Sequence, residues 1–321
     1  MHEASQLPNS SHIGVNLVQF KNEVERRTDK AIAIEIYDNS RLYKDNEVVG
    51  AVSSAAIEMG LVAADQFVDK VPAIGIFQQP FLFNFEALVR AALSPDREMR
   101  KLIDKAVLEV TGTRVLWWLP FGSTVFLSKG QPAISPTEVS NKKVRVLGQT
   151  MATFMKYCGG TPEVLAASDQ LKAIQDGRVD MTMTGVSGVP ARHLWQVTDT
   201  ITRTDHATFE MMVVVNEAAW QRLGESHRAI IAEVASKVER DIRDRISEIE
   251  ADAYRFASEK GMKVYELTPD QVAEWRACSA PVLEAFMMDA GDLARQLLGA
   301  YGKLRTDPCC SSGPAGSFNR R

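Results

Sequence analysis

Short apolar segments alternate with amphipathic segments along the first 120 residues. Residues 16–27 place Leu17, Phe20 and Val24 on one face of a helix. Residues 31–37 are rich in β-branched side chains and end at a polar turn, which predicts a strand. The same reasoning predicts helices at 45–54 and 96–111 and strands at 59–62 and 114–119. This alternation is typical of an α/β fold with a largely parallel sheet.

A second unit repeats the pattern between residues 143 and 215. Ser168 is expected to cap one of its helices, which stops at Gly177. Residues 211–215 are apolar throughout, as in a strand covered on both faces. The predicted strands are 143–147, 163–165, 179–183 and 211–215, and the predicted helices are 150–158 and 169–176.

The strongest periodic signal lies in residues 225–259. Apolar side chains recur there at spacings of three and four and form one helical stripe: Ile230, Val234, Val238, Ile242, Ile246, Ile249, Ala253 and Phe256. A helix of this length is roughly 50 Å long and must contact both lobes or project. A coiled coil is the alternative, but the spacing of four drifts around the helix. The last helical region, 269–301, is expected to pack back over a lobe.

Composition narrows the class of protein. The 321 residues are 45% hydrophobic and 24% charged, which is ordinary for a globular chain of about two lobes. With 37 Lys and Arg against 41 Asp and Glu, the net charge is −4, and no basic stripe suggests nucleic acid. No apolar run reaches the roughly 18 residues that cross a bilayer.

The chain ends and the cysteines are less informative. The N-terminal residues are polar and show no signal peptide, so the protein is cytoplasmic or its leader is absent from this chain. The cysteines form no C-x-x-C pair and leave the redox compartment open: Cys158, Cys278, Cys309 and Cys310. The Gly/Ser/Pro-rich segment from Pro308 is expected to be a frayed end.

Catalytic and metal-binding signatures are missing. There is no G-x-G-x-x-G, no Walker loop and no H-E-x-x-H, and Val189 breaks a nucleophile-elbow pattern. The five histidines lack metal-ligand spacing. We therefore assign no catalytic residue, no metal site and no cofactor.

Arg145 is the one residue that points to binding chemistry. It interrupts the apolar strand 143–147. It is either a solvent-exposed sheet-edge residue or an anion partner, because its planar guanidinium suits a bidentate carboxylate.

Seven features, in register along nearly the whole chain, resemble the solute-binding proteins of TRAP transporters, the DctP-type periplasmic receptors. The most specific is the segment 76–83, which is similar to F-x-x-P-F-L-F, and the long helix is another. The others are residues 7–12 (a first binding loop), 39–47 (N-G-x-L-G-x-x-x-E), 56–60 (G-x-x-D-M-G), 143–146 (K-[IV]-R-V) and 171–180 (Y-x-A-L-Q-x-G-x-V-D-G).

The resemblance implies an α/β, two-lobed periplasmic-binding-protein-like fold with a mixed sheet in each lobe and a long helix spanning both. Lobe I would comprise residues 1–123 plus 208–250, and lobe II residues 124–207 plus 251–304. Residues 305–321 would form a flexible tail. Strands near 122–126 and 205–215 would bend as hinges.

It also implies a receptor that binds a small organic acid between the lobes, with Arg145 clamping the carboxylate. Thr124 stands where some members carry a second arginine, and Thr184 replaces an asparagine. These departures favour a monocarboxylate with an apolar or aromatic body over a dianion. The other residues at ligand-binding positions are Glu47, His12, Asp65, Trp118, Phe83 and His206. For aromatic residues in these motifs, core packing is the alternative.

The resemblance implies a periplasmic location, delivery to TRAP permease membrane subunits, and a monomer or weak dimer. It implies no enzyme activity and no nucleic-acid partner. The alternative is a cytoplasmic α/β enzyme that holds a carboxylate substrate through Arg145. An effector-binding half of a regulator would share the architecture, but no basic helix-turn-helix segment is present.

Overall fold

The computed structural model describes residues 1–307 and 310. In these residues ten strands join one mixed sheet in the order β2-β1-β3-β9-β4-β7-β5-β6, with β8 beside β4 and β10 beside β8. The strands are β1 (His2–Ala4), β2 (Glu35–Tyr37), β3 (Met59–Ala63), β4 (Thr113–Ser128), β5 (Lys143–Val146), β6 (Thr161–Val164), β7 (Met181–Gly185), β8 (Thr200–Arg203), β9 (Thr208–Asn216) and β10 (Lys263–Glu266).

Strand β4 joins the two halves of this sheet. Its first part pairs antiparallel with β9, and its last residues pair antiparallel with β7 and β8. The register with β9 shifts between Val115 and Trp117 and again between Pro120 and Gly122. The crossing of the chain through β4 and β9 confirms the mixed sheet of a two-lobed fold, whereas the expectation of a largely parallel sheet was wrong at its centre.

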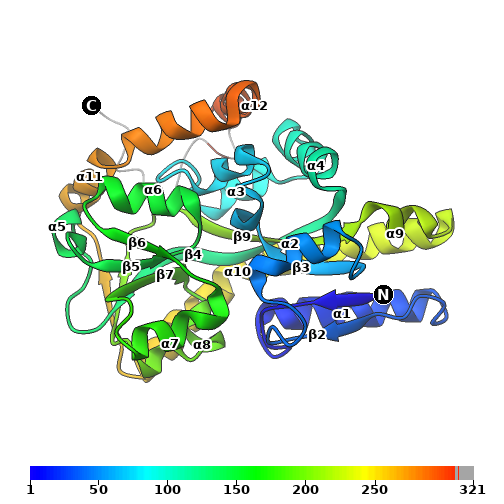
Figure 1. The fold of residues 1–321 in the computed structure, drawn as a ribbon, viewed down its shortest axis with the longest axis horizontal. Coiled ribbons are helices and arrows are strands. Elements are labelled where there is room, and N and C mark those ends of the chain that lie inside the picture. The colour runs from blue at the N-terminus through cyan, green and yellow to red at the C-terminus, as the bar shows by residue number, and fades with distance from the viewer. Residues whose placement is uncertain (308–309, 311–321) are drawn as a thin grey trace.

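Helices cover both faces of the sheet (Figure 1). The α-helices are α1 (His12–Arg27), α2 (Asp45–Ser53), α3 (Glu86–Ala92), α4 (Glu98–Thr111), α5 (Pro136–Val139), α6 (Gln149–Tyr157), α7 (Gln170–Gln175), α8 (Gly188–Ala191), α9 (Glu217–Arg222), α10 (Glu225–Glu259), α11 (Pro269–Ala277) and α12 (Ala280–Thr306). The 3-10 helices are η1 (Ala64–Phe67), η2 (Pro72–Gln78), η3 (Ala167–Asp169) and η4 (Leu194–Gln196).

Helix α10 has the bounds that its apolar stripe predicted. It packs against α1 at one end and against α8 and β10 at the other, with β4 between. It therefore contacts both halves of the molecule, and its buried side chains face the sheet instead of a second long helix.

The C-terminal helical region returns across the molecule. It consists of α11 and α12, and α12 breaks at Gly291, whose φ of 55° is outside the helical range. Helix α12 lies along η2, α3 and α4 and also touches α6 (Figure 1). The proposed tail is partly helical, since α12 continues to Thr306, and residues 308–309 and 311–321 lie outside the described residues.

Local expectations failed at two places. Ser168 lies inside η3 and makes no capping bond to α7, which begins at Gln170. Strand β2 keeps only the last three residues of the predicted 31–37 segment. Short segments of this kind take their final form from neighbouring strands and loops.

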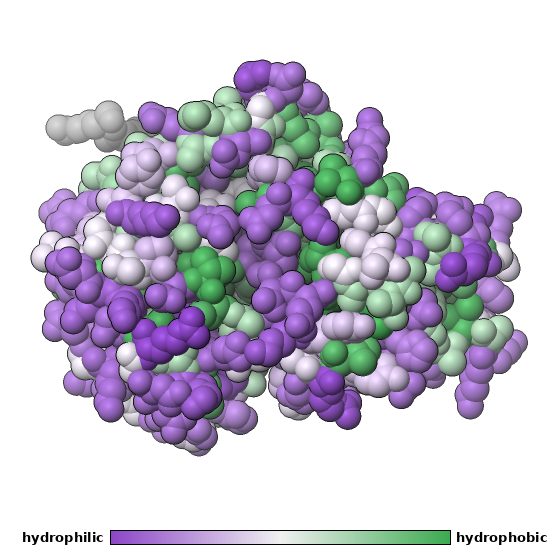
Figure 2. All heavy atoms as spheres, in the orientation of Figure 1, coloured by the Kyte–Doolittle hydropathy of each residue, from purple (hydrophilic) through white to green (hydrophobic). Residues whose placement is uncertain are grey.

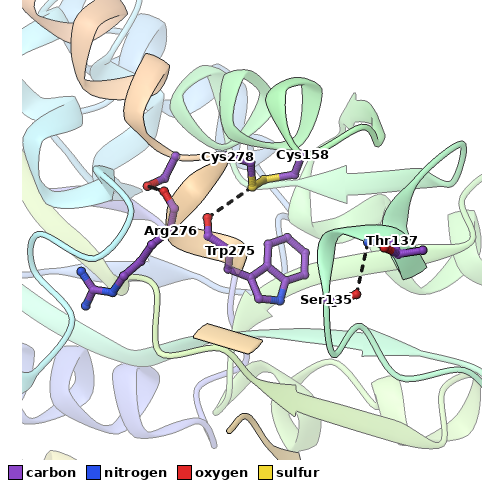
Figure 3. The surroundings of a disulfide bond; sticks show 7 residues. Ser135, Thr137, Cys158, Trp275, Arg276 and Cys278 are labelled. Atoms are coloured by element: carbon purple, nitrogen blue, oxygen red, sulfur yellow. Dashed lines mark hydrogen bonds between the residues drawn. A yellow bond between two sulfur atoms is a disulfide. The ribbon is translucent and has the colours of Figure 1, made fainter. Parts of the chain in front are cut away.

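A disulfide joins Cys158 at the end of α6 to Cys278 at the end of α11. The two residues are 120 positions apart in sequence, and their Cα atoms are 5.2 Å apart. Cys278 Sγ lies 3.2 Å from Trp275 O (Figure 3). The bond ties the C-terminal helices to the half of the sheet that carries β5, and a stable disulfide is typical of an oxidising compartment.

Two large hydrophobic clusters and a smaller one form the core. Among residues 1–307 and 310, no helix is long and apolar enough to cross a membrane.

Candidate functional site

A groove of about 1180 Å³ separates the N-terminal half of the molecule from the half built around β5 to β7. Figure 1 shows α1 and β2 on one side and α7 and α8 on the other, and Figure 2 shows the surface hollowed between them. Polar side chains such as Ser10, His12 and Ser40 line the first side, Ser168 and Ser187 line the second, and α10 contributes its middle turns.

A much smaller cavity, of about 10 Å³, adjoins this groove. Gln6, Ala167 and Arg192 line both spaces. The small cavity brings together four charged side chains from distant parts of the chain: Asp45, Asp65, Arg145 and Arg192. Two cations and two carboxylates therefore converge on a space about the size of one water molecule.

Arg145 is a buried residue of an interior strand. Strand β5 lies between β6 and β7, so the sheet-edge alternative is excluded. Its Nε and Nη2 donate to Leu165 O at 3.1 and 2.9 Å, and its Nη1 donates to Met183 O at 2.9 Å. Within the described residues this leaves one N–H on each terminal nitrogen without a partner, and a carboxylate can accept from both terminal nitrogens. Burial lowers the pKa of Arg145, which the charges of Asp45 and Asp65 partly oppose.

Arg192 was missed by the sequence analysis. It directly follows α8, and its Nη1 donates to Thr184 Oγ1 at 3.2 Å and its Nη2 to Gln6 Oε1 at 3.3 Å. Its guanidinium also lies over the ring of Phe121, 5.0 Å from the centroid. Burial, followed by the charge of Arg145, lowers the pKa of Arg192 to about 10. The only signal in the sequence was a lone arginine in a polar turn, which is ordinarily a surface residue.

A backbone N–H holds the carboxylate of Asp45 in α2, and a side-chain amide holds that of Asp65 in η1. Asp45 Oδ2 accepts from Ala167 N across the groove at 3.0 Å, and Asp65 Oδ2 accepts from Gln66 Nε2 at 3.0 Å. Burial and the charge of Asp45 raise the pKa of Asp65 to about 7, which Arg145 opposes. Asp65 therefore holds a proton more readily than an ordinary aspartate does.

Two further predicted residues lie next to this site. Thr184, in β7, is buried and holds Arg192. His12 lines the groove, donates from Nε2 to Pro120 O at 3.2 Å and stacks on Phe121. Burial lowers the pKa of His12 to about 4, so it is a neutral hydrogen-bonding group at physiological pH.

The remaining predicted residues lie apart from the cavity. Glu47 is exposed and accepts from Lys44 N at 2.8 Å as the capping residue of α2, while Asp45 two positions earlier faces the cavity. Thr124 is buried in β4 and is absent from the walls of both spaces.

The predicted aromatic and imidazole contacts are core residues. Trp118 donates to Asp104 Oδ1 at 3.0 Å, and it packs with Phe83 in one hydrophobic cluster. His206 is buried among Phe81, Phe126 and Phe154 and is bonded to Thr204 Oγ1. Burial lowers the pKa of His206 to about 3. For these residues the structure favours the packing alternative.

The site can bind and orient an anion. Backbone groups hold Arg145 and Asp45, and side chains hold Arg192 and Asp65. Across residues 1–307 and 310, no three His, Cys, Asp or Glu side chains group as metal ligands.

Comparison with known proteins gives a family match over residues 4–289, to "Bacterial extracellular solute-binding protein, family 7". The C4-dicarboxylate-binding periplasmic protein DctP of Rhodobacter capsulatus is 27% identical over 84% of this chain and 80% of its own.

Solved structures share the fold. DctP7 of Bordetella pertussis, an extracytoplasmic solute receptor binding pyroglutamic acid, superposes with a TM-score of 0.88 at 20% identity, covering 94% of this chain and 98% of its own. A TRAP periplasmic solute-binding protein of Roseobacter denitrificans with bound β-D-glucuronate also has a TM-score of 0.88, at 22% identity and with the same coverage of both chains.

Proposed function

The chain belongs to family 7 of the bacterial extracellular solute-binding proteins, and on that premise we propose that it binds a small organic acid through its carboxylate at the cavity lined by Arg145. A member of this family is a receptor of a transport system and not an enzyme. The alternative of a cytoplasmic enzyme acting on a carboxylate is therefore excluded.

The observation that carries the proposal is the hydrogen bonding of Arg145. Three of its five N–H groups are held by the carbonyls of Leu165 and Met183, which fixes the plane of the guanidinium. The other two, one on each terminal nitrogen, are left to donate to a carboxylate at the cavity that Arg145 lines. Ion pairing there compensates a charge that burial otherwise makes costly.

The charges of the cavity support a monocarboxylate. Arg145 and Arg192 add two positive charges, Asp45 subtracts one, and Asp65 subtracts a further fraction that depends on pH. The set therefore carries between zero and one net positive charge, so a monocarboxylate leaves at most one negative charge unbalanced, whereas a dianion leaves at least one. Leu147 and Phe209 supply an apolar wall for the body of the acid. We propose Thr184 and His12 as neighbours of the bound acid, through Arg192 and the groove respectively.

The wider role follows from the family. We propose that the receptor works outside the cytoplasm, as a monomer or weak dimer, and delivers its acid to TRAP permease membrane subunits. The disulfide between Cys158 and Cys278 supports an oxidising compartment. Closure would join residues 1–123 plus 208–250 to residues 124–207 plus 251–304, with bending near 122–126 and 205–215.

A thermal-shift panel tests the proposal on the purified full chain. Small monocarboxylates are compared with their uncharged amides at equal concentration. An acid at a hundredfold excess over its Kd stabilises the protein by about 2.7 kcal/mol, while its amide gives no shift. Absence of any shift across the acids, with native mass spectrometry showing no co-purified acid, contradicts the proposal.

A further inference from the structure

We propose that the acid bound by this receptor carries a hydrogen-bond donor, a hydroxyl or an N–H, and that Asp45 and Asp65 accept from it. The inference rests on the proposed function, since it describes the same cavity. It narrows the ligand to a hydroxy- or N–H-bearing monocarboxylate.

The first observation is that both carboxylates keep one oxygen without a partner. Asp45 is 3% exposed and Asp65 is 6% exposed, and both line the cavity. Each Oδ2 has a donor, from Ala167 N and Gln66 Nε2 respectively. Each Oδ1 is buried and finds no donor among the described residues. A buried acceptor in this condition is uncommon in native proteins and needs a specific reason.

The second observation is that the donors around the cavity are committed to other groups or suited to an anion. Arg145 donates three of its N–H groups to backbone carbonyls, and Arg192 donates to Thr184 and Gln6. Gln6 Nε2 is also buried without a partner. Unsatisfied donors and unsatisfied acceptors therefore line one space, and a molecule with both an anionic and a donating group satisfies both sets.

The third observation concerns the room left for Asp65. A Cβ on Gly148 would lie 2.8 Å from Asp65 Oδ2, so a side chain at the start of α6 would collide with this carboxylate. The absence of a side chain at Gly148 therefore makes room for Asp65 at the cavity. A site built to pair with a donor discriminates strongly against an analogue that lacks it.

The ligand chemistry follows from these positions. A plain alkyl carboxylate satisfies the arginines and leaves both Oδ1 atoms unpaired. A dicarboxylate without a hydroxyl places a second anion among two aspartates. A hydroxy acid or a cyclic amide acid pairs its carboxylate with Arg145 and gives its O–H or N–H to an aspartate.

Calorimetry with matched acids tests the inference on the full chain. The pairs are lactate and propionate, 2-hydroxybutyrate and butyrate, and pyroglutamate and 3-oxocyclopentanecarboxylate, and the members of each pair differ in one donor-bearing group. We expect the donor-bearing acid of at least one pair to bind more than about tenfold more tightly than its partner. In Asp65→Asn or Asp45→Asn that ratio should fall by at least about fivefold, while the acid lacking the donor should bind as tightly or more tightly, because the substitution removes a negative charge from the cavity.

Asp69→Asn is the matched control, because Asp69 is exposed and close to Asp65 in sequence. Thermal melts confirm that each variant is folded. Equal binding within all three pairs, or ratios unchanged in both cavity variants, overturns the inference and leaves the proposed function standing. If no acid binds the wild-type protein at all, the proposed function itself has failed.

Discussion

Arg145 and Arg192 line the same small cavity, and burial together with the charge of Arg145 lowers the pKa of Arg192 to about 10. Two guanidinium groups that repel each other in a buried place are a source of binding energy for an anion. The negative charges of Asp45 and Asp65 partly compensate the two guanidinium charges. The protein can therefore fold with both arginines buried, and the cavity can still bind an anion.

Replacement of Arg145 by lysine should reduce affinity for the bound acid by about 10- to 100-fold. Lysine keeps the charge but cannot contact Leu165, Met183 and a carboxylate in one plane. Calorimetry with the best acid of the panel measures the change. Arg178→Lys, at an exposed position in the same half of the molecule, is the control and should bind normally. Near-native affinity of Arg145→Lys for the acid would show that Arg145 does not bind the carboxylate.

Replacement of Arg192 by glutamine should weaken acid binding and stabilise the ligand-free protein by about 1 kcal/mol. The variant removes the cation that lies beside Arg145, while an amide can still donate to Thr184. Chemical denaturation without ligand and calorimetry with ligand measure the two effects. Arg222→Gln, on the exposed surface of α9, should change neither. Loss of stability together with normal binding would show that Arg192 is a packing residue.

Removal of the disulfide should destabilise the protein by about 2–5 kcal/mol without changing affinity. Cys158 and Cys278 close a long loop and lie outside the residues that line the cavity. The variant is the double replacement by serine, compared with wild type by urea denaturation. A reductant should lower the stability of the wild type and leave the double variant unchanged, which is the internal control. A large loss of affinity in the double variant would instead show that the position of the C-terminal helices affects ligand binding.

Glu3 should make stability fall as the pH rises. Burial in β1 raises the pKa of Glu3 from its ordinary value of 4.5 to about 8, and neither carboxyl oxygen has a partner among the described residues. Between these values the folded protein keeps a proton that the unfolded chain has released. The free energy of unfolding therefore loses about 1.4 kcal/mol per pH unit from this group and changes no further above pH 8.

The measurement is the difference in stability between wild type and Glu3→Gln at pH 5, 6, 7 and 8. The variant should gain progressively over wild type across this window. Glu274→Gln, at an exposed position of α11, is the control variant. A flat difference for Glu3→Gln would mean that the carboxyl is ionised in the folded protein.

The sequence was sufficient wherever the signal is local and repeated. The stripe from Ile230 to Phe256 predicted the bounds of α10, because each turn of a long helix places apolar residues on the same face. Arg145 stood out because a guanidinium in an apolar strand breaks a local pattern. The family motifs added the two-lobed fold, which helix and strand periodicity alone does not specify.

Only the tertiary structure decided which side chains meet. Asp45 and Glu47 lie in the same turn of α2, yet one faces the cavity and the other caps the helix, because the packing of α2 against β3 sets its rotation. Trp118 and Phe83 join a core that forms between distant segments. Arg192 reaches Gln6, and Cys158 reaches Cys278, over sequence separations too long for any periodic pattern to report. A binding site is a set of such long-range contacts. The sequence therefore indicated which types of residue could bind an acid, whereas the packing of the sheet and helices decided which of those residues meet.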